Sequence, residues 1–551
     1  MYKTFFLQHK DHHDSHNLDL SSFISLEQLT KSLADTFGFS DSNALWLADQ
    51  HGCHISTLEH VHETKDTVQV RPTRYGSIRE PPGPRLLPFV GNHYELYPDV
   101  LGNYDRLFSL YGPMIKTVNM GTTIYHTNDP SISRHILRED KLFTKSTSDP
   151  SHPLHYMADQ DCLFTCDSAS PAFASSRKFV APTMSPRAVA HFTPLIQEAA
   201  QSVFPAFDQL ADGNLAINVY QYMFKLAAQI IWRVVLDQDL KHFESPKTPP
   251  SLPIRLFGQY LSLMKKASLQ PQWMKYLPFG NAVKLKTVRQ QVLHVTEQAM
   301  NASIETDGES LLLSDPEAIN SATCVADFLY RAADKTGERL PQDLVLANVV
   351  VTCGAGFTTS SSLLSWALYA LVRYPGNQER LFNEVALHYT NSSIEKRWTY
   401  DEIHGMEFLD CFVKEVLRLH SPSFQTARNA RKDAILPGGY FIPKGSVVIA
   451  CFPSIQKNPA HWNNPLRFDP DRWMEKGFAT QQARNGSYTP FAAGGRGCVG
   501  FTLALTQVKI VLTALIYRYE FFDESPEAVI YDPEFLVVRP LNFYAGMIRR
   551  K

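Results

Sequence analysis

The sequence lacks the cysteine pattern of a disulfide-stabilised or zinc-binding protein. Its 551 residues include eight cysteines, and none of them forms a Cys-x-x-Cys pair. Cys162 and Cys166 lie four positions apart, but no second pair of ligands follows at the spacing of a zinc site. Scattered cysteines in a chain of this length indicate a reducing, intracellular environment.

A bias of charge is also absent, because 53 lysines and arginines stand against 55 aspartates and glutamates and the net charge is -2. This balance gives no reason to expect a nucleic acid partner. No stretch offers the roughly 20 apolar residues of a membrane-spanning helix. The N-terminus, MYKTFFLQHK, turns polar too soon for the apolar core of a signal peptide. We therefore expect no transmembrane helix, and any membrane contact to be peripheral, through Phe5–Leu7 and apolar surface loops.

Residues 1–75 differ from the rest of the chain in being rich in histidine and aspartate. They show one weak helical pattern, across Leu26–Leu47. Four histidines could bind a metal, but a solvated flexible tail is the favoured interpretation of that stretch, which contains His9, His12, His13 and His16. A proline-rich connector, Pro81–Pro88, then marks the entry to the main domain, because prolines fix φ and remove hydrogen-bond donors. We predict a polar, partly disordered extension over 1–75 and a catalytic domain over 76–551.

Helical periodicity dominates the main domain. The apolar spacing predicts helices over 188–211, 216–236, 283–303, 343–371, 375–389, 407–419 and 499–518. Strand-like pieces are short and few: a strand pair in Met114–His126, one piece near Phe441–Ala450 and one near Val537–Ile548. No internal repeat is present.

Residues 491–500 read Phe-Ala-Ala-Gly-Gly-Arg-Gly-Cys-Val-Gly. A cysteine that binds haem iron as a thiolate needs nearby positive charge or a helix N-terminus, and Cys498 has Arg496 before it and an apolar helical run after it. The glycines leave bare backbone that a flat macrocycle can approach. On this motif alone, a glycine-rich loop with a buried structural cysteine is the alternative.

The motif resembles the cytochrome P450 signature F-x-x-G-x-R-x-C-x-G, with Phe491, Gly494, Arg496, Cys498 and Gly500 in its specified positions. The resemblance implies a mainly α fold, a large helical domain with small β-sheets. It also implies protohaem (haem b) as cofactor, with Cys498 as the axial ligand and with Phe491 and Arg496 beside the cofactor. A thiolate ligand donates electron density that favours O–O cleavage.

Further motifs follow in the order that the family has. Glu415 and Arg418 lie at i and i+3 on a helix, and Phe468-Asp469-Pro470-Asp471-Arg472-Trp473 follows them. They look like the family's Glu-x-x-Arg helix and its next element, which implies a buried network of Glu415, Arg418 and Arg472 with a structural role.

Upstream, Val349–Ser360 is an apolar helix with two glycines and a cluster of hydroxyls, which favours local opening of the backbone hydrogen bonds. On this segment alone, a packed core helix with a kink is the alternative. This stretch resembles the family's oxygen-activation segment, with Thr359 as the hydroxyl of the proton relay. The sequence departs from the pattern at Thr358, where the family usually has Asp or Glu, so Thr358 is a second candidate for the relay.

Two arginines look like ligands of the haem propionates. Phe173-Ala174-Ser175-Ser176-Arg177 resembles the family's W-x-x-x-R with Phe in place of Trp, and Arg428 lies ten residues after Arg418. Arginine suits a planar carboxylate because it donates two parallel hydrogen bonds. A surface ion pair is the alternative for each of them.

The resemblance implies a monooxygenase that inserts one oxygen atom of O2 into a lipophilic small molecule, and we expect a role in secondary metabolism. Electrons would come from a separate NADPH-dependent cytochrome P450 reductase, since residues 1–75 and the haem domain use up the chain. The protein would be soluble or attached peripherally to the endoplasmic reticulum. Two alternatives stay open: a haem-thiolate isomerase or dehydratase that needs no reductase, and a haem-binding sensor. Weak candidates for substrate contact are Phe164, Val351, Ala355, Phe424, Gln425 and Phe535.

Overall fold

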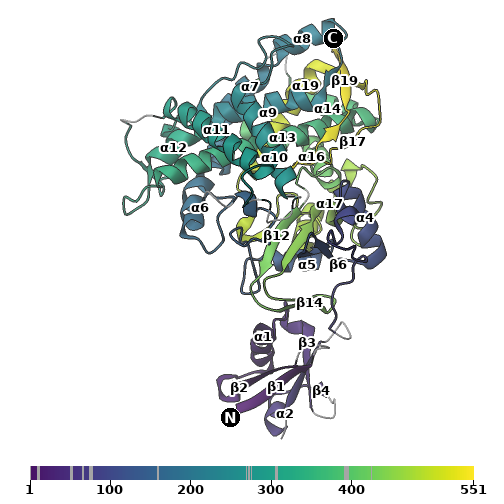
Figure 1. The fold of residues 1–551 in the computed structure, drawn as a ribbon. Coiled ribbons are helices and arrows are strands. Elements are labelled where there is room, and N and C mark those ends of the chain that lie inside the picture. The colour runs from purple at the N-terminus through teal and green to yellow at the C-terminus, as the bar shows by residue number, and fades with distance from the viewer. Residues whose placement is uncertain are drawn as a thin grey trace.

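The computed structural model has a small N-terminal module and a large, mainly helical domain (Figure 1). It describes residues 2–8, 13–49, 54–64, 67–72, 78–157, 161–268, 270, 274, 276–304, 308–389, 396–423 and 425–550.

Helices make up most of the large domain. Their bounds are α3 His93–Leu96, α4 Val100–Tyr111, α5 Pro130–Ile136, α6 Pro171–Thr183, α7 Pro186–Gln201, α8 Phe204–Asp212, α9 Val219–Leu236, α10 Leu252–Ser268, α11 Asn281–Asn301, α12 Val325–Arg331, α13 Gln342–Arg373, α14 Asn377–Ala386, α15 Tyr400–Gly405, α16 Glu407–Leu419, α17 Phe452–Gln456, α18 Phe478–Asn485 and α19 Phe501–Arg518. The helix predicted over 188–211 is two helices, because Pro205 has no N–H to continue α7 and instead opens α8.

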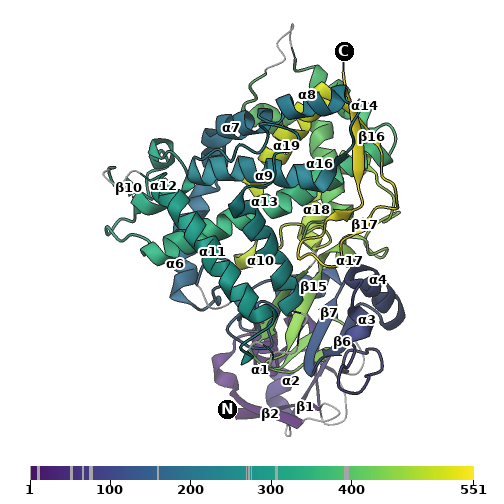
Figure 2. The ribbon, with the colours of Figure 1, turned by 45° about the horizontal axis from the view of Figure 1, so that its top comes forward.

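The central helix α13 crosses the helical part and packs against α9, α16 and α19 (Figure 2). It ends at Arg373, just before Tyr374-Pro375, as expected because the residue before proline avoids the helical region. By length and hydropathy alone, α13 and α19 could each cross a membrane, but both are largely buried inside the protein. Their apolar sides build the main core with residues of α7 and α9.

A five-stranded sheet lies between the helical part and the module. Its order is β6 (Met114–Asn119), β7 (Thr122–Thr127), β15 (Val447–Cys451), β12 (Gln425–Ala430) and β8 (Phe143–Thr144). The pair β7–β15 is parallel and the other pairs are antiparallel. The remaining strands of the large domain are short and form β13 Ala434–Leu436 with β14 Tyr440–Ile442, β16 Tyr519–Asp523 with β19 Tyr544–Arg549 and β9 Ile217–Asn218, β17 Ile530–Tyr531 with β18 Pro540–Leu541, and β10 Leu311–Leu312 with β11 Ala332–Ala333.

The N-terminal module, the described part of residues 2–72, differs from the flexible tail that the sequence predicted. It contains β1 Tyr2–Gln8, β2 His13–Asp19, α1 Leu26–Phe37, β3 Leu45–Ala48, β4 His54–Ile55, α2 Leu58–Glu63 and β5 Val68–Pro72. The sheet has the order β2-β1-β5-β3-β4, with β1 and β5 parallel in the middle and an antiparallel hairpin on either side. This is the β-grasp topology.

Apolar residues at alternate strand positions give the module its own core, which the overall polar composition concealed. Phe5 and Leu7 of β1, Leu45 and Leu47 of β3, and Val68 and Val70 of β5 are buried against Leu29 and Leu33 of α1. Of the four histidines, His13 and His16 lie in β2, and His9 and His12 lie outside the described residues.

Candidate active site

The loop that carries Cys498 is fixed by its backbone. The amide of Cys498 donates to the carbonyl of Phe491 at 2.9 Å, and Gly494 begins a short 3-10 turn with φ of 71°. A Cβ at Gly494 would lie 2.1 Å from the carbonyl oxygen of Leu137, so only glycine fits this approach. Helix α19 begins at Phe501, so the sulfur lies beside a helix N-terminus.

The thiol of Cys498 is accessible to solvent, yet protein atoms surround it closely enough that burial raises its pKa. A hydrogen bond from the backbone N–H of Gly500 opposes this rise. The protein alone therefore does not favour the thiolate of Cys498. A bound metal ion would favour the thiolate, because coordination deprotonates a thiol.

Arg496 does not assist the sulfur as the sequence suggested. Its guanidinium donates to the carbonyls of Leu163 and Cys166 and to Ser168, and it stacks on the ring of Phe173 at 3.5 Å from the centroid. Phe173 is the residue that replaces the tryptophan of the family pattern, and its ring supports Arg496 through a cation–π contact. Arg496 therefore points toward the side of the site where three other cationic side chains lie, those of Arg177, Arg428 and Lys145.

Four cationic side chains gather there. Arg177 donates to the carbonyl of Gly495 at 2.6 Å, and Arg428, almost fully buried, pairs with Glu139. One nitrogen of Arg428, Nη2, has no hydrogen-bond partner among the described residues. Burial lowers the pKa of Arg428, and it lowers the pKa of Arg496 to about 10. A buried guanidinium nitrogen without a partner, beside other cations, suits an anionic ligand.

The fourth cation, Lys145, was missed by the sequence analysis. Its ammonium donates to the carbonyl of Phe164 at 2.5 Å and lies 4.3 Å from the centroid of that ring. Burial, together with the positive charges of Arg496 and Arg428, lowers the pKa of Lys145 to about 7. No motif marks this lysine, because it comes into the cluster only through the pairing of β8 with β12.

On helix α13, the two threonines lie on different faces. Val351, Ala355 and Thr359 follow one another at intervals of four and are accessible, whereas Thr358 is buried about 100° around the helix. The Thr359 hydroxyl donates to the carbonyl of Ala355 at 2.8 Å, and the helix is continuous through this turn. The accessible face favours Thr359 over Thr358 for contact with a ligand.

Helix α19 ties the cysteine loop to this turn of α13. The side-chain amide of Gln507, two turns after the start of α19, donates to the carbonyl of Gly356 at 3.2 Å and to the hydroxyl of Ser360. Helix α19, which begins three residues after Cys498, therefore packs against the turn of α13 that contains Thr359.

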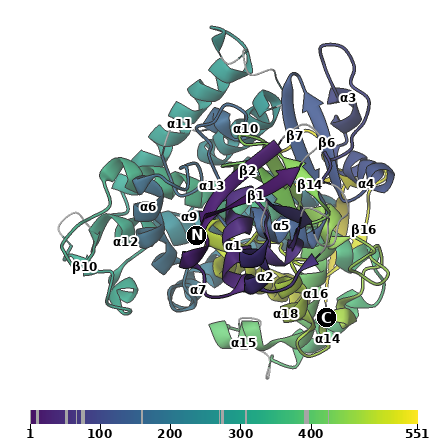
Figure 3. The same cartoon turned by 90° about the horizontal axis from the view of Figure 1, so that it is seen from below.

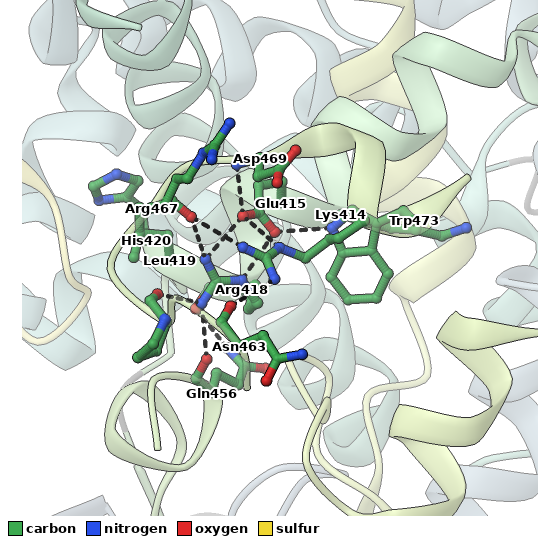
Figure 4. Close-up of polar contacts among 12 residues, drawn as sticks. Lys414, Glu415, Arg418, Leu419, His420, Gln456, Asn463, Arg467, Asp469 and Trp473 are labelled. Carbon is green, nitrogen blue, oxygen red and sulfur yellow. Dashed lines mark hydrogen bonds and ion pairs between the residues drawn. The ribbon is translucent and has the colours of Figure 1, made fainter. Parts of the chain in front are cut away.

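A buried ionic network supports the segment that leads to the cysteine loop (Figure 4). Arg418 donates two hydrogen bonds to Glu415, at 2.8 and 2.9 Å, and Arg472 donates a third at 3.0 Å. The indole N–H of Trp473 and the backbone amide of Asp469 also donate hydrogen bonds to the Glu415 carboxylate, each at 2.9 Å. The structure thus brings together the three charged residues that the sequence singled out, and it adds Trp473.

Further bonds join this network to the chain around it. Arg418 also donates to the carbonyls of Gln456, Pro465 and Arg467. Gln456 in turn accepts from the amide of Thr489, two residues before the cysteine motif. The network therefore fixes the segment from which the cysteine loop emerges.

Comparisons with known proteins agree with this geometry. The family model named Cytochrome P450 matches residues 81–546. The chain is 43% identical to the cytochrome P450 monooxygenase alnD of Emericella nidulans over 100% of this chain and 98% of that protein.

The chain belongs to the cytochrome P450 family.

A more distant relative and a solved structure are also similar to the chain. The chain is 23% identical to thromboxane-A synthase of Macaca fascicularis over 81% of its own length and 87% of that protein. The crystal structure of the cytochrome P450DA haem domain superposes with a TM-score of 0.74 at 22% identity, over 86% of this chain and 98% of that one. The predicted family and the predicted mainly α fold are confirmed, and the chain is an oxidoreductase that uses haem.

The residues of this cytochrome P450 fit a haem group. The accessible thiol suits the iron atom, and the bare glycine backbone beside it leaves room for a flat macrocycle. The unpartnered Nη2 of Arg428 suits a carboxylate of the macrocycle. Phe491 lies half-buried in the same loop, with its ring tilted toward Phe501 at 6.2 Å between centroids.

The candidates for substrate contact are not equivalent in this cytochrome P450. Val351 and Ala355 lie on the accessible face of α13, and Phe164 is exposed beside Lys145. Phe535 is buried between the ring of Tyr220 and the guanidinium of Arg539. Phe424 lies outside the described residues.

Gln425 points away from the site. Successive strand residues face opposite sides, so Gln425 lies on the other face of β12 from Thr426 and Arg428. Its side-chain oxygen accepts from the hydroxyl of Tyr104 at 3.0 Å. Thr426, whose hydroxyl accepts from Arg428 at 3.0 Å, is the better candidate on this strand.

Proposed function

We propose that this cytochrome P450 is a monooxygenase that inserts one oxygen atom of O2 into a lipophilic small molecule. The observation that carries the proposal is the accessible thiol of Cys498, in a loop held by its backbone and followed by α19, which bonds to the turn of α13 that contains Thr359. Haem b, held by the Cys498 thiolate, supplies the oxidising chemistry when it is bound.

Each residue of the chain has a separate part in this proposal. Arg177, Arg428, Arg496 and Lys145 hold the propionates as charge-assisted hydrogen-bond donors. Thr359 would accept and donate a proton at its hydroxyl oxygen, and its bond to the carbonyl of Ala355 is the one that it would release to do so. Thr358, being buried, positions the helix.

The substrate and the partners follow from the same site. Val351 and Ala355 offer an apolar surface next to Thr359, which suits a lipophilic substrate. The relative alnD is named a monooxygenase, which agrees with the proposed reaction. We also propose a role in secondary metabolism. We further propose that electrons come from a separate NADPH-dependent cytochrome P450 reductase.

We also propose peripheral contact with the endoplasmic reticulum membrane. The exposed side chains of Leu86, Leu87 and Phe89, at the entry to the large domain, support it. Phe5 and Leu7, which the sequence suggested for this contact, are instead buried in the core of the module.

The experiment that tests the proposed reaction is reconstitution with haem, NADPH and a cytochrome P450 reductase under 18O2. Lipophilic compounds that shift the spin state of the iron are the substrates to use. We expect a product that carries one 18O atom and whose formation stops without reductase. A product formed without NADPH and without label would show an isomerase or dehydratase and contradict the proposal.

A further inference from the structure

The N-terminal module docks on the hairpin β13–β14, which follows the strand that carries Arg428. Its contact is the end of α1, where Gly38 closes the helix in the left-handed conformation. The amide of Ile435 donates to the carbonyl of Gly38 at 2.7 Å, and the amide of Ser40 donates to the carbonyl of Ile435 at 3.1 Å. Phe39 thus adds a parallel bridge to strand β13.

The chain holds the other side of the same hairpin when it enters the large domain. Arg79 forms a parallel bridge to Tyr440 of β14, and its guanidinium lies 4.8 Å from the centroid of that ring. The hairpin β13–β14 is therefore held between the module and the connector. Ile435 and Phe441 of the hairpin join the core of the module, so the dock is apolar as well as hydrogen-bonded. Figure 3 shows the module from below, over the end of the domain where α5 and β14 lie.

Two further contacts reach the segments beside the hairpin. The carboxylate of Asp35 pairs with Lys141 at 2.9 Å, and the carbonyl of Asp35 accepts from Lys432. Lys141 precedes β8, and Lys432 follows β12. The module thus touches the residues that flank both strands of the β8–β12 pair.

These strands carry the anion-binding groups. Arg428 lies in β12, and Glu139, its partner, also accepts from the amide of Lys145 at 3.1 Å. Arg431, directly after β12, donates its amide to the carbonyl of Leu142 at 2.7 Å, which joins the two segments next to Lys141 and Lys432.

We propose that the N-terminal module is a brace that holds β8 against β12, and thereby places Arg428 and Lys145 for the haem propionates. This inference rests on the proposed function, because it concerns the same haem site. Asp35, Gly38 and Phe39 are positioning residues in it, since they act through the hairpin and the β8–β12 pair.

Gly38→Ala tests the brace. A Cβ at Gly38 would lie 2.1 Å from the backbone oxygen of Asp433, so the variant cannot keep the dock. Gly337→Ala is the matched control, because Gly337 has a similar positive φ of 83° but open space around its Cβ position. Both are made in the full chain.

Three readouts are measured. In the protein without haem, we expect amide exchange at Arg431 and Ile435 to be about tenfold faster in Gly38→Ala than in the wild type or in Gly337→Ala. In the haem-loaded protein, we expect haem transfer to an acceptor protein to be several-fold faster and the iron potential to be lower, because the cations withdraw from the propionates. A lowered iron potential in protein that still binds haem indicates a positioning role, because a loss of fold would release the haem altogether.

Haem loss and potential equal to those of the wild type in Gly38→Ala would overturn the brace. Should Gly38→Ala fail to fold, Asp35→Asn carries the test, with a change of about twofold in the same direction because the pair with Lys141 is exposed. A wild type that binds no haem would instead refute the proposed function, while the exchange at Arg431 would still report whether the module holds the β8–β12 pair.

Discussion

Lys145 offers the most quantitative test of the cation cluster. In the haem-free protein, its pKa is lowered to about 7 by burial and by the charges of Arg496 and Arg428. A propionate at this ammonium raises the pKa again, so haem binding takes up a proton there. A charge-assisted contact of this kind contributes about 1.5–3 kcal/mol, which is roughly ten- to hundredfold in haem affinity. We therefore expect Lys145→Met to bind haem about ten- to hundredfold more weakly at pH 6.

The pH dependence of this difference follows from the direction of the shift. Because the pKa of Lys145 is higher with haem than without it, the advantage of the wild type is complete below pH 7. It is lost over about one to two pH units above 7. Cys498 also exchanges a proton when it binds iron, so the quantity to measure is the ratio of the two dissociation constants, in which that contribution cancels.

The assay is haem titration of the wild type and of Lys145→Met from pH 6 to pH 9, followed in the Soret region. The ratio of dissociation constants should fall toward one as the pH rises through this range. A ratio that stays constant over the whole range, or that equals one at pH 6, would refute the placement of Lys145 at a propionate.

The remaining predictions concern the proton relay and the buried network. Thr359→Val should uncouple NADPH oxidation from product and release hydrogen peroxide, whereas Thr358→Val should leave the coupling nearly unchanged; equal effects of the two would contradict their assignment to different faces of α13. Glu415→Ala should lower the free energy of unfolding by about 3–5 kcal/mol, because the fully buried guanidinium of Arg418 and the largely buried one of Arg472 lose their carboxylate. Trp473→Phe should cost about 1.5–3 kcal/mol, since it removes one hydrogen bond to that carboxylate. Urea denaturation measures both, and a loss below about 1 kcal/mol for Glu415→Ala would show that the network is not needed for stability.

Much of the fold and of the site could be predicted where a short stretch of sequence sets the structure. The helical spacing of 343–371 and 407–419 predicted α13 and α16 to within a few residues, because an apolar stripe needs only local periodicity. The triad of Glu415, Arg418 and Arg472 is brought together because the first two lie one turn apart on a helix, while the third comes from the motif that follows.

What could not be predicted depends on contacts between distant segments. The direction of Arg496 is decided by carbonyls more than 300 residues earlier, at Leu163 and Cys166. The face of Gln425 depends on the register of β12 against β15, and one residue of shift would have reversed it. The folded N-terminal module could not be predicted because its apolar residues alternate in short strands within a polar stretch, which leaves no long apolar run.

The most direct test of the central claim, that Cys498 binds the haem iron as a thiolate, is the difference spectrum of the reduced protein with carbon monoxide. Wild type and Cys498→Ser are loaded with haem and compared at equal concentration. The wild type is expected to show the red-shifted band of a thiolate ligand, and the serine variant to lack it because its hydroxyl does not donate as a thiolate does. The same red-shifted band in the serine variant would contradict the assignment of Cys498.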